Sequence, residues 1–152
     1  MRVATLEMDV RSGDTAGNLD AALRGVQKAG EEGAELVAPP AMWSTGFVAG
    51  LGAPELADAA AALDAVAEAS ARMNLVVVGS GPALVDGAEL PVNRAHVLSS
   101  EGLVGGYDKV HLFSPTAEAL AFSAGDRPPM PTELPRCGVR VAPIICLSLI
   151  HI

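Results

Sequence analysis

The segment NRAHVLSSEGLVGGYDKVHLF, residues 93–113, contains two apolar runs separated by a turn signal. The runs cover 93–99 and 103–107, and Glu101-Gly102 lies between them. Short apolar runs joined by a glycine-containing turn are typical of antiparallel β-hairpins. We therefore expect neighbouring antiparallel strands in this part of the chain.

The region before this hairpin predicts alternating strands and helices. Apolar residues recur at helical spacing in two segments, whereas short β-branched runs indicate buried strands. Gly79-Ser80-Gly81 is interpreted as a turn, because no Gly-Lys-Ser/Thr follows it as a phosphate loop requires. The expected elements are strands at 2–9, 35–38, 75–79 and 82–85, helices at 19–29 and 54–73, and a last strand at 139–146. This order predicts a layered α/β architecture.

Composition and charge restrict the class of protein. The 152 residues are 50% hydrophobic, which is enough for the core of a single domain. A net charge of -8 argues against nucleic acid or an anionic membrane surface as partner. The first residues resemble neither a signal peptide nor a membrane span, so we expect a cytoplasmic protein. Cys137 and Cys146 predict neither a disulfide framework nor a metal site.

Three segments together carry a resemblance to a known family: LVAPPAMWSTGF at 36–47, residues 93–113, and VAPIIC at 141–146. In order and spacing they resemble the nitrilase, or carbon-nitrogen hydrolase, superfamily, in particular its amidase-like branch. The resemblance implies a four-layer α-β-β-α sandwich, commonly a homodimer, that needs no cofactor. It covers about half of such a domain, so we expect residues 1–146 to form an incomplete sandwich, the N-terminal half.

The resemblance also implies catalytic roles for individual residues. Cys146 occupies the position of the nucleophile, and Lys109 that of the ammonium that stabilises the oxyanion of the tetrahedral intermediate. Glu118 matches a supporting acidic position that orients the lysine or the substrate. The residues alone leave other interpretations open, namely a surface lysine, a core cysteine and a solvated carboxylate.

Residues 41–47 depart from the family pattern at one position. Ala41 stands where the family has its glutamate base. A positioned base typically contributes about 10²–10⁴ in rate, so we expect this chain to be inactive or nearly so. Trp43 and Phe47 are predicted to bind the acyl part of the substrate, although aromatic residues in loops are as often core residues.

The final six residues, LSLIHI at 147–152, do not follow the family pattern. A transposon-end sequencing adapter encodes these residues when translated, and we hypothesise that they are a non-native read-through tail. Genomic sequence at this locus would test the hypothesis.

Two functions from different classes remain open. The first is hydrolysis of non-peptide carbon-nitrogen bonds, as an amidase acting on small carboxylic amides through a cysteine thioester, with a nitrile as the other candidate substrate. The second is a catalytically dead pseudoenzyme or small-molecule binding module with the same fold. A third interpretation, a doubly wound ligand-binding domain, predicts parallel strands throughout.

Overall fold

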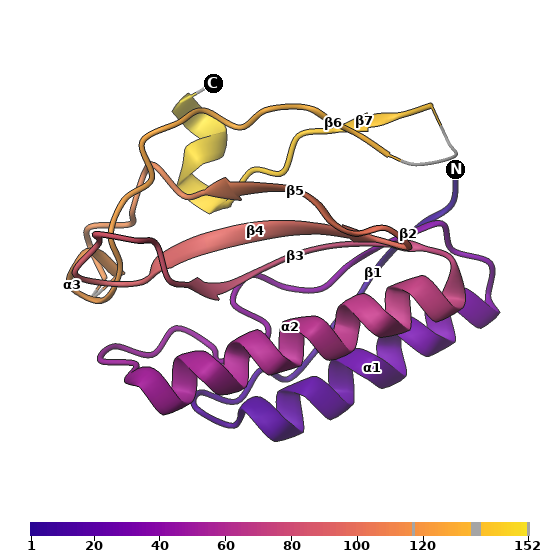
Figure 1. Cartoon of the computed structure of the whole chain (residues 1–152), viewed down its shortest axis with the longest axis horizontal. Helices are drawn as coiled ribbons and strands as arrows, with labels where there is room; N and C mark the ends of the chain where they lie inside the picture. Colours follow the sequence, from indigo (N-terminus) through magenta and orange to yellow (C-terminus); the bar gives the residue numbers. More distant parts are fainter. Residues whose placement is uncertain (117, 135–137, 152) are drawn as a thin grey trace.

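The computed structural model describes residues 1–116, 118–134 and 138–151. The elements are β1 (Val3–Thr5), α1 (Thr15–Glu31), β2 (Leu36–Ala38), α2 (Ala53–Met73), β3 (Val76–Ala83), β4 (Val92–Ser99), β5 (Gly102–Asp108), α3 (Glu118–Ala121), β6 (Thr132–Glu133), β7 (Arg140–Val141) and the 3₁₀ helix η1 (Cys146–His151). Figure 1 shows that the long helices, the main sheet and the β6–β7 ladder form successive layers.

Five strands form one mixed sheet in the order β1-β2-β3-β4-β5. The pairs β1–β2 and β2–β3 are parallel, whereas β3–β4 and β4–β5 are antiparallel. The antiparallel neighbours predicted from the turn signals are therefore confirmed. The doubly wound interpretation is wrong, because it required parallel strands throughout.

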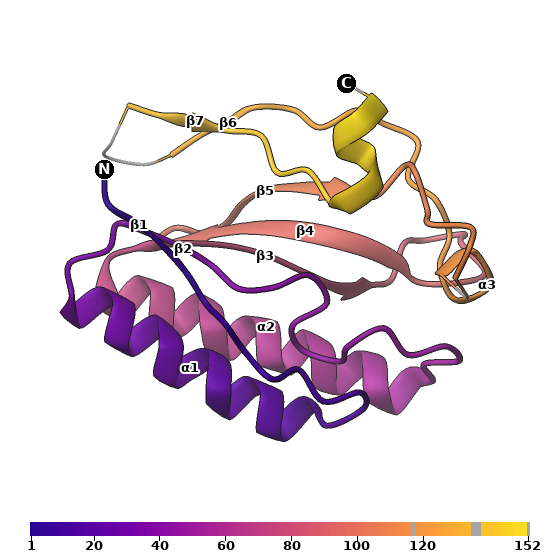
Figure 2. The same ribbon diagram turned by 180° about the vertical axis from the view of Figure 1, so that it is seen from behind.

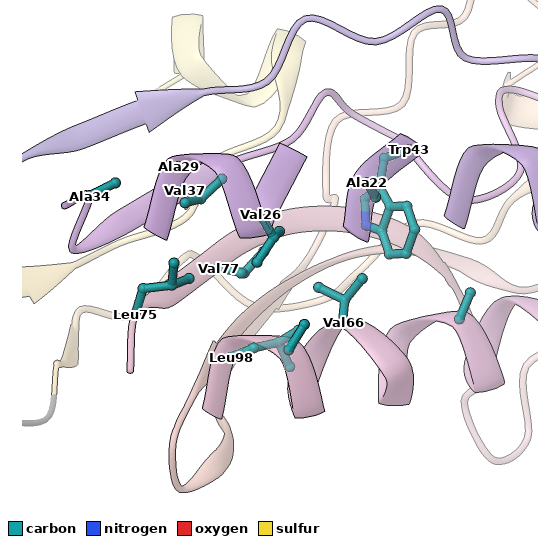
Figure 3. Packing of buried hydrophobic residues seen from close by; sticks show 12 residues of the cluster. Ala22, Val26, Ala29, Ala34, Val37, Trp43, Val66, Leu75, Val77 and Leu98 are labelled. Carbon is teal, nitrogen blue, oxygen red and sulfur yellow. The ribbon is translucent and has the colours of Figure 1, made fainter. Parts of the chain in front are cut away.

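Helices α1 and α2 lie side by side on one face of this sheet (Figures 1 and 2). The core between them and the sheet includes Val26, Val66, Val37 and Val77, together with Trp43 from the loop after β2 (Figure 3). α2 ends at Met73 and is capped by Asn74, whose left-handed conformation is a common helix stop. Within the described residues, no helix combines the length and apolarity that crossing a membrane requires.

The opposite face of the sheet is covered by the ladder of β6 and β7 (Figures 1 and 2). Buried Leu134 and partly buried Val141 pack there against Leu36, Val76 and Val97 of the sheet. Helices, sheet and this second ladder give the incomplete α-β-β-α arrangement expected from the sequence.

Two local predictions were wrong. Gly79-Ser80-Gly81 is not a turn but the middle of β3, which joins the strands expected at 75–79 and 82–85. Glycine is needed at 79 because a β-carbon there would lie 2.6 Å from Cγ of Pro39. The strand expected at 139–146 is only Arg140–Val141, and Pro143 beyond it has no N–H to donate to a ladder.

Candidate active site

Lys109 follows β5 directly and its side chain is buried, with the residue 1% exposed. Its backbone N–H donates to the carbonyl oxygen of Asn93 at 2.9 Å, and its own carbonyl accepts from Gly125 at 2.9 Å. These bonds tie the end of β5 to β4 on one side and to a later loop on the other. The alternative of a surface lysine is therefore excluded.

Glu118, the first residue of α3, accepts hydrogen bonds from Lys109 through both carboxylate oxygens. The Nζ–Oε1 distance is 2.8 Å and the Nζ–Oε2 distance is 2.7 Å. The backbone N–H of Phe113 donates to Oε2 at 2.8 Å, and Nδ2 of Asn93 donates to Oε1 at 3.3 Å. Glu118 is 5% exposed, so it is not a solvated carboxylate.

The charge state of Glu118 reflects two opposed effects. Desolvation by burial raises the pKa of this carboxyl group, but hydrogen bonds from Lys109, the Phe113 N–H and Asn93 lower it, and the net pKa lies below its ordinary value. Glu118 is therefore ionised at neutral pH and supplies the counter-charge for the Lys109 ammonium.

Cys146 is exposed and begins η1 with a positive φ of 47°. Residues on both sides of it are anchored to β5. The side chain of Ile145 packs against Tyr107, and the Tyr107 hydroxyl donates to Oγ of Ser148 at 2.8 Å. The thiol is thus presented at the surface by a fixed backbone, and the alternative of a core cysteine is excluded.

A cavity of about 380 Å³ brings Lys109, Glu118 and Cys146 together. Most of its remaining wall is apolar and includes Phe47 and Phe122. A thiol and a paired ammonium on the wall of a largely apolar cavity are the groups that acyl transfer through a covalent intermediate requires.

Not every predicted site residue lines this cavity. Trp43 is 2% exposed and belongs to the core between the helices and the sheet. Ala41 is exposed in the loop after β2, and the next residue, Met42, is buried with a positive φ of 53°. Cys137 lies outside the described residues. Among those that are described, no cluster of three or more His, Cys, Asp or Glu residues could hold a metal ion.

Three residues were not predicted to belong to the site, and two of them line the cavity. Asn93, which is fully buried and holds both Glu118 and the backbone of Lys109, was assigned only to a strand. Ala121 and Phe122 line the cavity, although no sequence motif points to them as site residues. The Ala-Leu-Ala-Phe run at 119–122 was the available signal for this apolar wall.

The family model described as carbon-nitrogen hydrolase matches residues 2–151. This chain belongs to the carbon-nitrogen hydrolase family. The family and the fold expected from the three motifs are thereby confirmed. A comparison with curated proteins gave no match.

Solved structures of an amidase of the nitrilase superfamily, from Nesterenkonia sp. AN1, are similar to this chain. The NitN amidase after tag removal has a TM-score of 0.83 and 25% identity, over 97% of this chain and 57% of that chain. A glutamate-to-glutamine variant with acrylamide added to its active-site cysteine has a TM-score of 0.82 and 26% identity, over 96% and 57%. A cysteine-to-alanine variant in complex with butyramide has a TM-score of 0.80 and 26% identity, over 93% and 54%. This chain therefore spans little more than half the length of that amidase.

Proposed function

We propose that the complete protein hydrolyses small carboxylic amides through a thioester on Cys146. The observation that carries this proposal is the single cavity shared by Cys146, Lys109 and Glu118. The similar amidase binds butyramide, and the apolar walls here suit a short acyl chain of that kind.

The reaction has two covalent steps. The sulfur of Cys146 forms a bond to the amide carbon, and the carbonyl electrons move to oxygen, where the Lys109 ammonium stabilises the negative charge. Collapse of this intermediate breaks the C–N bond, and the nitrogen takes a proton and leaves as ammonia. Water then attacks the thioester, which releases the acid and restores the thiol.

Because position 41 is Ala, this chain lacks the glutamate that would transfer protons in both steps. Solvent water must then carry the thiol proton away and return one to the leaving nitrogen, so we propose slow turnover and an intact nucleophile. The acrylamide adduct in a glutamate-to-glutamine variant of the similar amidase supports this separation of roles, because its cysteine forms a covalent bond without that glutamate.

The decisive experiment is Ala41→Glu in a protein extended to the length of the family domain. The expected result is a gain of about 10²–10⁴ in the rate of ammonia release from butyramide. Ala57→Glu, on the exposed side of α2, is the matched control and should leave the rate unchanged. Cys146→Ser added to Ala41→Glu should abolish the gain.

The position of Ala41 also favours a second candidate, a binding module that retains the cavity without turnover. Acrylamide labelling of Cys146, located by peptide mass mapping, separates the two functions when it is combined with the Ala41→Glu assay. Labelling together with restored hydrolysis identifies an impaired amidase. Labelling without restored hydrolysis identifies the binding module, and failure of both would contradict the assignment of Cys146 as nucleophile.

Three further expectations remain predictions. The homodimer can be tested by light scattering of the extended protein, and the cytoplasmic location by fractionation of the source cells. The interpretation of 147–152 as a read-through tail can be tested by genomic sequence.

A further inference from the structure

The cavity that contains Cys146 is larger than a short acyl chain requires. Its volume is about 380 Å³, whereas an apolar cavity of about 150 Å³ already accommodates benzene. A second cavity, of about 180 Å³, lies between α2 and the sheet and is lined in part by Leu63 and His96. No described residue lines both cavities, so the acyl group of a substrate bound at Cys146 has only the larger one to occupy.

All three phenylalanines of the chain line the cavity that contains Cys146. Phe47 comes from the loop after β2, Phe113 from the segment after β5, and Phe122 follows α3 directly. Phe122 is 2% exposed and packs with Met42, whereas Phe47 and Phe113 are 57% and 39% exposed. Aromatic rings pack favourably against one another, edge to face or offset. An aromatic ligand would therefore cover ring surface that the fold leaves exposed.

The charges of the lining indicate which acyl groups fit beside these rings. Among the described lining residues, Lys109 and Glu118 are the only Lys, Arg, Asp or Glu, and their side chains pair with each other at 2.7 Å. A charge on the acyl chain would lose its hydration in the cavity without gaining a counter-charge. The lining therefore favours a neutral acyl group.

We propose that this cavity selects amides of neutral arylalkyl carboxylic acids, with the aromatic ring against the phenylalanines and the amide carbon at the sulfur of Cys146. The inference rests on the proposed function, because it takes the amide to be held against Cys146. The covalent steps are the same: 3-phenylpropanamide and water give 3-phenylpropanoic acid and ammonia through the thioester. Burial of the apolar ring is the term that distinguishes this substrate from a shorter amide.

Three amides that differ at one position test the selection. On the same propanamide frame, 3-phenylpropanamide carries a phenyl group, propanamide a hydrogen and succinamate a carboxylate. Each is added to the 152-residue chain before Cys146 is labelled with acrylamide, and the label is measured by peptide mass mapping. Half-protection by 3-phenylpropanamide should need about a 10- to 100-fold lower concentration than half-protection by propanamide, and succinamate should protect least. Equal protection by the first two amides, or no labelling of Cys146, would overturn the proposal.

Hydrolysis by the extended Ala41→Glu protein separates a failure of this inference from a failure of the proposed function. The kcat/KM for ammonia release should be about 10- to 100-fold higher for 3-phenylpropanamide than for propanamide. Release from propanamide without that preference would contradict the arylalkyl selection alone. Protection of Cys146 by 3-phenylpropanamide without release from any of the amides would contradict hydrolysis and support the selection.

Two variants and a matched control locate the aromatic group of the ligand. Phe47→Ala removes an exposed ring and should lower the preference for 3-phenylpropanamide by about 2- to 10-fold. Ala121→Leu adds volume to the wall and should lower it as well. Leu120→Ala is the control, because Leu120 is 81% exposed and does not line the cavity. Circular dichroism establishes that each variant is folded, and Phe47→Ala decides if Ala121→Leu does not fold. An unchanged preference in Phe47→Ala would contradict the proposal.

Discussion

Lys109 and His96 both lie almost fully buried at the wall of a cavity, but the fold treats the two groups in opposite ways. Lys109 meets a carboxylate through both oxygens, and that carboxylate is held by two further donors. Nδ1 of His96 has no such partner in the part of the chain that the structure describes, and the pKa of His96 is lowered to about 4. One cavity thus retains a charge, and the other excludes it.

The difference shows what it takes to keep a charge in a protein interior. Desolvation opposes the ionised form of both Glu118 and His96. Hydrogen bonds from Lys109, Phe113 and Asn93 outweigh that penalty for Glu118, whereas nothing comparable offsets it for His96. Because a buried ion pair adds little net stability over apolar residues of similar volume, the pair at Lys109 is better explained by the chemistry proposed for its cavity.

The largest expected effect comes from breaking this pair on one side only. Glu118→Gln leaves the Lys109 ammonium buried without a counter-charge, and places an amide where the Phe113 N–H needs an acceptor. We expect a loss of about 3–5 kcal/mol in the free energy of unfolding, measured by urea denaturation.

Replacing both partners sharpens the comparison. The double variant Lys109→Met with Glu118→Leu should recover most of the stability lost in Glu118→Gln, because no unpaired charge then remains. Glu101→Gln on the surface is the control for loss of a carboxylate and should change stability by less than about 0.5 kcal/mol. If Glu118→Gln changed the free energy of unfolding no more than Glu101→Gln does, the buried carboxylate would contribute no more to stability than a surface one.

The next largest expected effect is the change in stability with pH that arises from His96. With a pKa of about 4 in the folded state, against an ordinary value of 6.5, His96 takes up its proton more readily in the unfolded chain. Stability is therefore greatest above pH 6.5 and falls as the pH falls, by about 2 kcal/mol from pH 7 to about pH 5.

Because the pKa of Glu118 is lowered, the effects of Glu118 and His96 on stability appear in different pH ranges. A carboxyl group with a lowered pKa contributes stability above its unfolded value of 4.5, and loses it only as the pH falls through the lower folded value. The window above about pH 5 therefore reports His96. Urea unfolding at several pH values measures the slope, and His96→Leu should remove it; a slope that persists in this variant would assign the effect to other groups.

Much of the fold was predictable because local signals agreed with the final packing. The helix spacing of α1 and α2 and the turn at Glu101-Gly102 gave the order of elements and the antiparallel strands. The turn predicted at Gly79-Ser80-Gly81 was wrong because the glycines serve a close approach between β3 and the loop after β2, which no local pattern reveals. The strand predicted at 139–146 was too long for a similar reason. Only Arg140 and Val141 pair with another strand before the chain reaches Cys146.

The cavity that contains Cys146 was predictable in part and for a different reason. Lys109, Glu118 and Cys146 were identified through motifs, and the structure brings them to one cavity. Trp43 and Phe47 lie only four residues apart in one loop, yet the first is in the core and the second is exposed at the cavity. Between the two residues the loop turns through Gly46, which has a positive φ of 68°. Asn93 was missed because its role appears only when β4 lies beside the end of β5.

The smallest expected effect concerns a half-buried ion pair between β4 and β5. Arg94 and Asp108 form a two-pronged pair at 2.5 and 2.8 Å across β4 and β5, with side chains 31% and 26% exposed. Asp108 raises the pKa of Arg94 through this hydrogen bond, but solvent screens the pair. A double-mutant cycle with Arg94→Gln and Asp108→Asn should give a coupling of about 1 kcal/mol.

The exposed pair Arg72–Glu68 on α2 provides the matched comparison, with an expected coupling of about 0.3 kcal/mol. Arg94 offers a second measurement, because its charge is one cause of the low pKa of His96. Arg94→Gln should therefore move the pKa of His96 upward, observable by NMR titration of the ring protons. If the coupling of Arg94–Asp108 were no greater than that of Arg72–Glu68, and the pKa of His96 did not move, burial alone would set the charge state of His96.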